Sequence, residues 1–220
     1  MFEKELYIRF LLLLVAPKRA WSRINVEDAS HKARSSINVE DASHKTRSSI
    51  KTDDASSKAV SEFVFPFVAI CTIVVFCTNL MRLDWARSAL NGALVEAMGC
   101  CVSLFGGFYL ASYLINKSGH LFFKLIDNWP LSQQITGYGM VIYFLITIIA
   151  ALFPQFFQSI SFLRLLPMCY TFCIVWQGYG ILMQTERILR IKQTLLAGIL
   201  IVIVPELLRF VFNLITYYTL

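Results

Sequence analysis

Residues 63–81 read FVFPFVAICTIVVFCTNLM and contain no charged side chain. A helix of this length covers roughly 29 Å, which is close to the hydrocarbon thickness of a bilayer. A buried helix of a soluble protein normally keeps a polar stripe on one side, and this stretch has none. Its polar residues, Thr72, Thr78 and Asn79, can bond backbone carbonyls or a neighbouring helix. The stretch therefore predicts a membrane-spanning helix, preceded by a cytoplasmic segment at residues 1–62.

The composition of the whole chain indicates the same class of protein. Of its 220 residues, 57% are apolar and 15% are charged, whereas a soluble domain carries about 25% charged residues. The net charge of +6 comes from basic residues between the apolar runs, which suits membrane topology and disfavours nucleic-acid binding. All six cysteines fall inside apolar runs without metal-site spacing, so we expect no metal ion and no cofactor.

Four more apolar runs follow the first. We expect an all-α fold: an integral membrane bundle of five transmembrane helices with a cytoplasmic, amphipathic and polar N-terminal extension. The expected spans are residues 63–81, 89–115, 133–153, 165–183 and 194–215. The chain then divides into the extension at 1–62 and the membrane domain at 63–220. The second span is rich in Gly, Ala and Ser, which let helices approach closely in lipid, so we expect it at the centre of the bundle.

The distribution of Lys and Arg predicts the orientation in the membrane. With the N-terminus inside, the inner segments 1–62, 116–131 and 184–193 carry sixteen of these residues, and the outer loops carry three. Positive residues concentrate on the cytoplasmic side of membrane proteins. We therefore expect a multi-pass protein of the cytoplasmic (inner) membrane, with the N-terminus cytoplasmic and the C-terminus outside.

The first 24 residues contain a short apolar run, for which a secretory signal peptide is the alternative interpretation. The acidic Glu3 and Glu5 spoil a basic leader, and Lys18 and Arg19 follow the run where a cleavage site would lie. Large apolar residues beside basic ones suit a helix that lies in the membrane interface. The residues expected to face the membrane are Tyr7, Phe10, Leu14 and Trp21.

A tandem repeat fills most of the extension. Residues 25–37 read NVEDASHKARSSI, residues 38–50 read NVEDASHKTRSSI, and a diverged third copy begins at Lys51. A period of thirteen does not preserve a helical face, so each copy is expected to start its own short helix. His31 and His44 recur by duplication and are therefore not evidence for a metal site.

Three stretches resemble the Yip-domain family of small five-span membrane proteins, in particular its bacterial members. The first is Pro17-Lys18-x-Ala20-Trp21-x-x-Ile24, the second is Phe63-Val64-Phe65-Pro66, and the third is the run 170–183, YTFCIVWQGYGILM. The resemblance covers most of the chain apart from the thirteen-residue duplication, which departs from the family's pattern. It implies the five-span fold. It implies no activity, and the link of eukaryotic relatives to vesicle trafficking and small GTPases is not carried over.

Three charged residues fall inside the expected spans and form the candidate site. Glu206 and Arg209 are three residues apart on one helix face, and Glu96 is a further acid that can reach Arg209. Each charge alone at mid-membrane costs roughly 2.5–3.5 kcal/mol, so pairing is expected. The three residues can serve as a proton or ion relay or as a counter-charge for a substrate. Alternatively, they form a structural pair that locks the second and fifth spans together.

The remaining patterns argue against an enzyme. The three histidines lie in expected cytoplasmic segments, and the glycine clusters neither follow a strand nor precede a phosphate-binding lysine. We therefore expect no catalytic residue. The first hypothesis is a non-enzymatic interaction or organising protein whose N-terminal arm and basic loops contact a protein partner or anionic lipid. The alternative is a small transporter or lipid-handling protein that uses Glu96, Glu206 and Arg209. The bilayer is one partner, and a homo-oligomer is compatible with either hypothesis.

Overall fold

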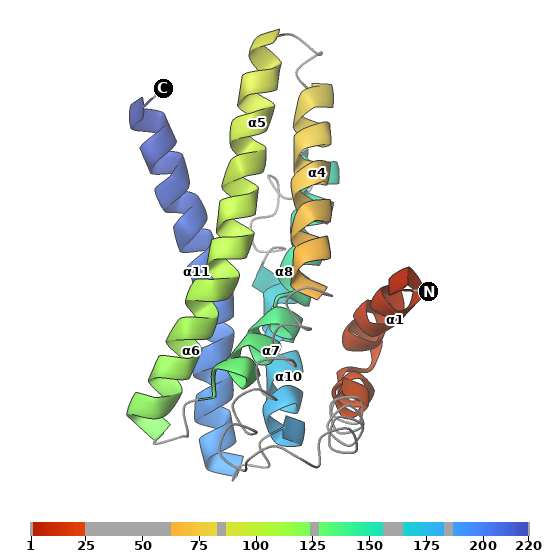
Figure 1. Cartoon of the computed structure of the whole chain (residues 1–220), viewed down its shortest axis with the longest axis vertical. Coiled ribbons are helices and arrows are strands. Elements are labelled where there is room, and N and C mark those ends of the chain that lie inside the picture. Colours follow the sequence, from red (N-terminus) through yellow and green to blue (C-terminus); the bar gives the residue numbers. More distant parts are fainter. Residues whose placement is uncertain are drawn as a thin grey trace, which may run out of the picture.

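The computed structural model describes residues 2–24, 63–82, 87–123, 128–155, 165–182 and 187–219, and within these ranges every regular element is a helix (Figure 1). The elements are α1 (Phe2–Val15), α4 (Phe65–Arg82), α5 (Arg87–Cys101), the π-helical η2 (Val102–Gly106), α6 (Gly107–Phe123), α7 (Trp129–Gly139), α8 (Val141–Leu152), α10 (Leu165–Leu182) and α11 (Arg187–Thr219). A further helix covers residues 17–24. The thirteen-residue repeat lies outside the described residues.

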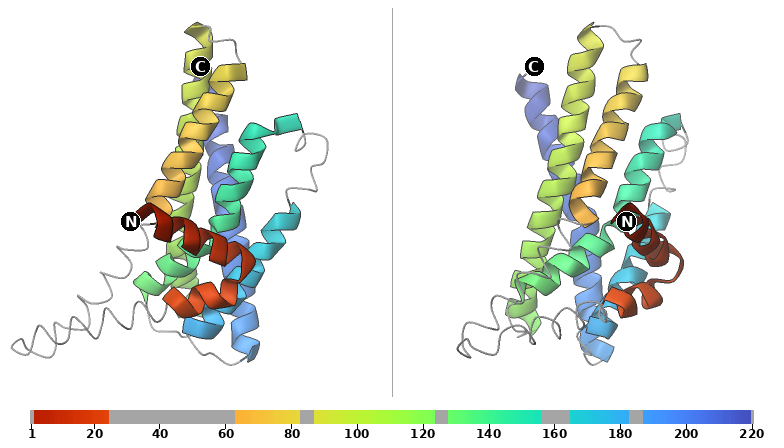
Figure 2. Two further views of the ribbon diagram at one scale, coloured as in Figure 1. Left: turned by 90° about the vertical axis from the view of Figure 1, so that its right-hand side faces the viewer. Right: turned by 45° about the vertical axis from the view of Figure 1, so that its right-hand side comes forward.

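Four helices are long and apolar enough to cross a membrane: Phe65–Arg82, Leu90–Leu121, Trp129–Leu152 and Arg187–Tyr218. The predicted all-helical fold is confirmed for the described residues, and the length and composition of these four helices support the predicted transmembrane character. The helix α10 covers most of the residues expected for the fourth span. It lies toward the opposite end of the bundle from α4, so the two helices are offset along the long axis (Figures 1 and 2). Five spans and the orientation of the termini stay predictions.

The second and last long helices are both longer than their sequences predicted. The chain is helical from Arg87 to Phe123 through the π-helical segment η2, and α11 runs through Pro205 for 33 residues. The two helices cross where Gly107 of α6 lies against Pro205 of α11. A Cβ atom at Gly107 would lie 2.8 Å from Cγ of Pro205, so only glycine permits this approach.

The third expected span, residues 133–153, corresponds to the candidate span Trp129–Leu152, but it is not one uninterrupted helix. The structure has two helices, α7 and α8, with a break at Met140. The break lies among close neighbours, since a Cβ atom at Gly139 would come within 2.8 Å of Cδ1 of Ile201 and 3.2 Å of Cγ2 of Val175. In an 18-residue stretch of each, 61% of Trp129–Leu152 is buried against 44% of the small-residue helix Leu90–Leu121. The centre of the bundle is therefore α7–α8 rather than the second span.

The N-terminal helix pair, defined as α1 and residues 17–24, packs against the side of the bundle next to α8 and α10 (Figure 2). Phe10 stacks on Phe67 of α4 with ring centroids 4.7 Å apart, and Trp21 is completely buried. Two of the residues expected to face the membrane therefore face protein. Their spacing indicated an amphipathic helix, but could not say whether lipid or protein would cover its apolar side.

Candidate functional site

The three charged residues singled out in the sequence lie near the crossing of α5–η2 with α11. The π-helical turn and Pro205 both disturb the regular backbone bonding here, and π-helical turns are frequent at functional sites. Ser103 in η2 donates its hydroxyl hydrogen to the carbonyl oxygen of Pro205, with the oxygens 2.8 Å apart. This buried bond fixes the two helices at their closest approach.

Arg209 reaches across from α11 to α5. Its Nη2 atom lies 3.6 Å from Oε2 of Glu96. The pair joins the second and last long helices. The arginine side chain is 30% exposed and the glutamate side chain 48% exposed, so the pair lies at the outer surface of the bundle and not in its core.

Glu206 contacts Tyr143 instead of Arg209. Tyr143 of α8 donates its hydroxyl hydrogen to Oε1 of Glu206, with the two oxygens 3.0 Å apart. The three charged residues therefore belong to one region but divide into two contacts, Arg209 with Glu96 and Glu206 with Tyr143. Sequence reasoning missed Tyr143 because it stands in the aliphatic run VIYFLITIIA, where an aromatic residue has no distinguishing spacing.

The C-terminal half of α11 presents a mixed surface around Arg209. Asn213, four residues further along the same helix face, is exposed. Its surroundings are large exposed apolar side chains, namely Leu207, Phe210, Val211, Leu214 and Ile215. Glu96, Arg209 and Asn213 thus give this otherwise apolar surface three polar side chains, and we call these three residues the polar strip.

A second group of polar atoms belongs to α10 and α11. Four buried atoms here have no hydrogen-bond partner among the described residues: Gln177 Oε1, Gln193 Nε2, Gln193 Oε1 and Thr194 Oγ1. Two contacts between α10 and α11, one on each side of these residues in the sequence, place them at a similar height along the helix axes. Arg190 donates to the carbonyl oxygen of Trp176 on one side, and Gly198 lies against Phe172 on the other.

The stretches that carry the Yip-like resemblance meet around Trp21. Its Nε1–H donates to the carbonyl oxygen of Ile174 over 3.0 Å, and a Cβ atom at Gly178 would strike its ring at 2.7 Å. Tyr138 meets the indole edge-on, with ring centroids 5.3 Å apart, and also lies against Phe63, with ring centroids 5.0 Å apart. All three stretches therefore contribute to one packed junction.

No group of His, Cys, Asp or Glu within the described ranges is arranged to hold a metal ion. Comparison of the chain with protein-family models, with curated proteins and with solved structures gave no match. The Yip-domain assignment therefore stays a prediction from the three sequence stretches.

Proposed function

We propose that the protein is a non-enzymatic, multi-pass protein of the cytoplasmic membrane that assembles with other membrane-spanning chains. The observation that carries this proposal is the half-exposed ion pair between Arg209 and Glu96. Together with the resemblance to the Yip-domain type, it favours an organising role over catalysis.

The energetic argument concerns what covers the pair. Charged side chains within a membrane span cost roughly 2.5–3.5 kcal/mol each, and such residues normally face other protein or a water-filled space. Here the two charges lie at the outer surface of α5 and α11. A transmembrane helix from a second chain, with a polar side chain of its own, would remove this surface from lipid.

Asn213 supports the same conclusion independently of charge. It lies one helical turn beyond Arg209, and its side chain is exposed. Lipid tails offer its amide group no hydrogen-bond partner, whereas a polar group of a second chain would. Asparagine side chains within spans often bond across helices. We therefore place the contact surface on the polar strip.

The five-span topology belongs to this proposal. We take α10 as the fourth of five spans because it is an apolar helix of 18 residues. The distribution of basic residues supports a cytoplasmic N-terminus. Residues 25–62 and the basic loops would then be available to a protein partner on the cytoplasmic side.

The test is cross-linking of the full-length chain at native abundance in its membrane, with mass spectrometry of the product. Asn213→Leu should lower the yield of the assembled form about threefold to twentyfold, the range expected for a lost hydrogen bond between membrane helices. Asn79→Leu on α4 is the matched control. Asn79 donates to the carbonyl oxygen of Val75 on its own helix, so its loss should leave assembly unchanged.

The composition of the cross-linked product distinguishes a homo-oligomer from a complex with another protein. Equal yields from both asparagine variants would contradict a contact at the polar strip. The contribution of the N-terminal extension should be measured by deleting residues 25–62 only. Deleting residues 1–62 would also remove Trp21, which is part of the folded bundle.

A small transporter or lipid-handling protein is the second candidate, and one observation favours it. The four unpartnered atoms of Gln177, Gln193 and Thr194 require polar partners when buried. Water or a polar substrate group between α10 and α11 would satisfy them. Liposome flux measured for the wild type and for Glu206→Gln tests this function. If liposomes that contain the protein take up each tested solute no faster than empty liposomes do, this function is ruled out.

A further inference from the structure

The exposed side of the N-terminal helix pair carries two stripes of different character. On α1, the residues Ile8, Leu11 and Val15 are 44%, 57% and 79% exposed, and their spacing puts them on one helix face. On the following helix, the exposed residues are Lys18, Arg19, Ser22 and Arg23. The opposite faces of both helices pack on the bundle, so an apolar stripe and a basic stripe point outward together.

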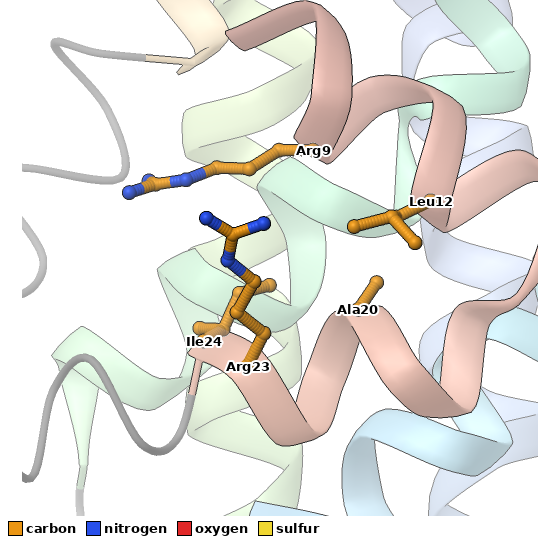
Figure 3. Close-up of a pocket in the computed structure, with 5 residues that line it drawn as sticks. All are labelled: Arg9, Leu12, Ala20, Arg23 and Ile24. Carbon is orange, nitrogen blue, oxygen red and sulfur yellow. The ribbon is translucent and has the colours of Figure 1, made fainter. Parts of the chain in front are cut away.

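A shallow depression lies between the two helices. It is lined by Arg9, Leu12, Ala20, Arg23 and Ile24. The guanidinium groups of Arg9 and Arg23 lie near each other on one side of it, with Ile24 beside Arg23, while Leu12 and Ala20 lie on the other side (Figure 3). Two cations from different helices are therefore held beside apolar side chains.

We propose that Arg9 and Arg23 clamp the phosphate group of an anionic phospholipid, with the lipid's acyl chains beside Leu12 and the apolar stripe of α1. Guanidinium groups bind phosphate through paired, charge-assisted hydrogen bonds. Leu12 and the apolar stripe of α1 lie beside the two arginines. Lipid acyl chains would cover these apolar side chains and a free phosphate ion would not, so the site favours a lipid.

The position in the bundle suits this ligand. In Figure 1, α1 lies near the middle of the long axis, and the second helix of the pair lies nearer the end where α6 ends and α11 begins. The loops at that end are expected to be cytoplasmic and basic. Arg9 and Arg23 also make other interactions within the protein, so a lipid phosphate would share their donors. The inference rests on the membrane location in the proposed function, but not on the polar strip or on any protein partner.

The experiment is native mass spectrometry of the full-length chain in neutral detergent, titrated with phosphatidylglycerol or phosphatidylcholine. The wild type should retain phosphatidylglycerol in preference to phosphatidylcholine. Arg9→Gln/Arg23→Gln should weaken phosphatidylglycerol binding about tenfold or more, because it removes two charge-assisted donors. Lys18→Gln/Arg19→Gln removes the same charge from the neighbouring exposed face, and should change binding less than about twofold.

Equal losses from the two double variants would overturn the proposal, because they would indicate diffuse attraction to basic residues. Unchanged binding by Arg9→Gln/Arg23→Gln would also overturn it. Displacement of the lipid by equimolar inorganic phosphate would reassign the site to a free anion. If the glutamine variant does not fold, Arg9→Lys/Arg23→Lys keeps the charge and removes the planar forks, and a loss of several-fold is expected. Wild-type binding by that lysine variant would contradict the clamp.

Discussion

Replacing Trp21 with alanine should release the N-terminal helix pair from the bundle. The indole is completely buried, donates a hydrogen bond to the carbonyl oxygen of Ile174 and lies against Gly178, where no side chain could fit beside it. No other residue of the helix pair combines complete burial with a hydrogen bond to α10 in the described part of the chain. The docking of this segment should therefore depend on Trp21 more than on any single neighbour.

The magnitude follows from these contacts. Truncating a buried tryptophan to alanine costs about 3–5 kcal/mol, and every 1.4 kcal/mol changes an equilibrium about tenfold. The undocked state should become roughly 140-fold to 3,700-fold more populated. Trp21→Phe keeps an aromatic ring against Tyr138 but loses the N–H donor, so its effect should be about 1 kcal/mol, or roughly fivefold.

Limited trypsin digestion of the full-length protein in bilayer nanodiscs measures this population. Peptide bonds inside a docked helix are cleaved only when the helix opens, so the cleavage rate follows the opening equilibrium. Mass spectrometry should count cleavage after Lys18 and Arg19 alone, because both residues lie in the second helix of the pair. Cuts elsewhere in the chain then do not affect the result.

Ser22→Ala is the matched control for this prediction. Ser22 belongs to the same helix as Trp21, but its side chain is exposed and donates to the carbonyl oxygen of Lys18 in its own helix, so its truncation should leave the cleavage rate near that of the wild type. A Trp21→Ala rate within threefold of the wild type would refute the reasoning. It would mean that other contacts, such as the bond from Tyr170 to the carbonyl oxygen of Leu14, hold the segment.

Two further predictions concern the charged region. Arg209→Gln should leave the carboxylate of Glu96 unpaired, and the double variant with Glu96→Gln should recover much of the lost thermal stability in nanodiscs, with a coupling free energy of about 1–3 kcal/mol. Tyr143→Phe should destabilise the protein by about 1–3 kcal/mol, because it removes the hydroxyl donor to Glu206. Glu206→Gln, which can still accept that bond, should unfold close to the wild-type temperature.

Thermal unfolding of the same variants decides both predictions. Strict additivity in the Arg209 and Glu96 cycle would contradict a functional ion pair across α5 and α11. Equal destabilisation by Tyr143→Phe and Glu206→Gln would show that the carboxylate charge, and not the hydrogen bond, matters to the fold.

The sequence predicted the elements better than their arrangement. Long uncharged runs located the helices, because only a helix satisfies its backbone bonds within one apolar segment. The break at Met140 was not predicted, although residues 133–139, QQITGYG, are more polar than residues 141–150, VIYFLITIIA. The close neighbours of Gly139 come from α10 and α11, which are distant in the chain. Such contacts leave no local trace beyond the presence of a glycine.

The candidate site was predicted in part. Glu96, Glu206 and Arg209 stand out because charge is rare within apolar runs, and the structure brings all three to one region. The division into two contacts depended on Tyr143, and the spacing of Glu206 and Arg209 on one helix indicated proximity without choosing partners. Asn213 could have been found from the same spacing rule, since it lies four residues beyond Arg209 on the same face.

The rotation of each helix about its axis is the quantity that an apolar sequence leaves open. In a soluble protein, the polar side of a helix shows which face meets water. In a bilayer, lipid tails are as apolar as the protein interior, so inward and outward faces look alike. The helix pair illustrates this, because Trp21 and Leu11 are both apolar, yet one is buried and the other exposed. Polar residues within the spans therefore say most about which face of a helix meets protein. The half-exposed pair of Arg209 with Glu96 is costly against lipid, and for that reason it marks the surface where a second chain should be sought.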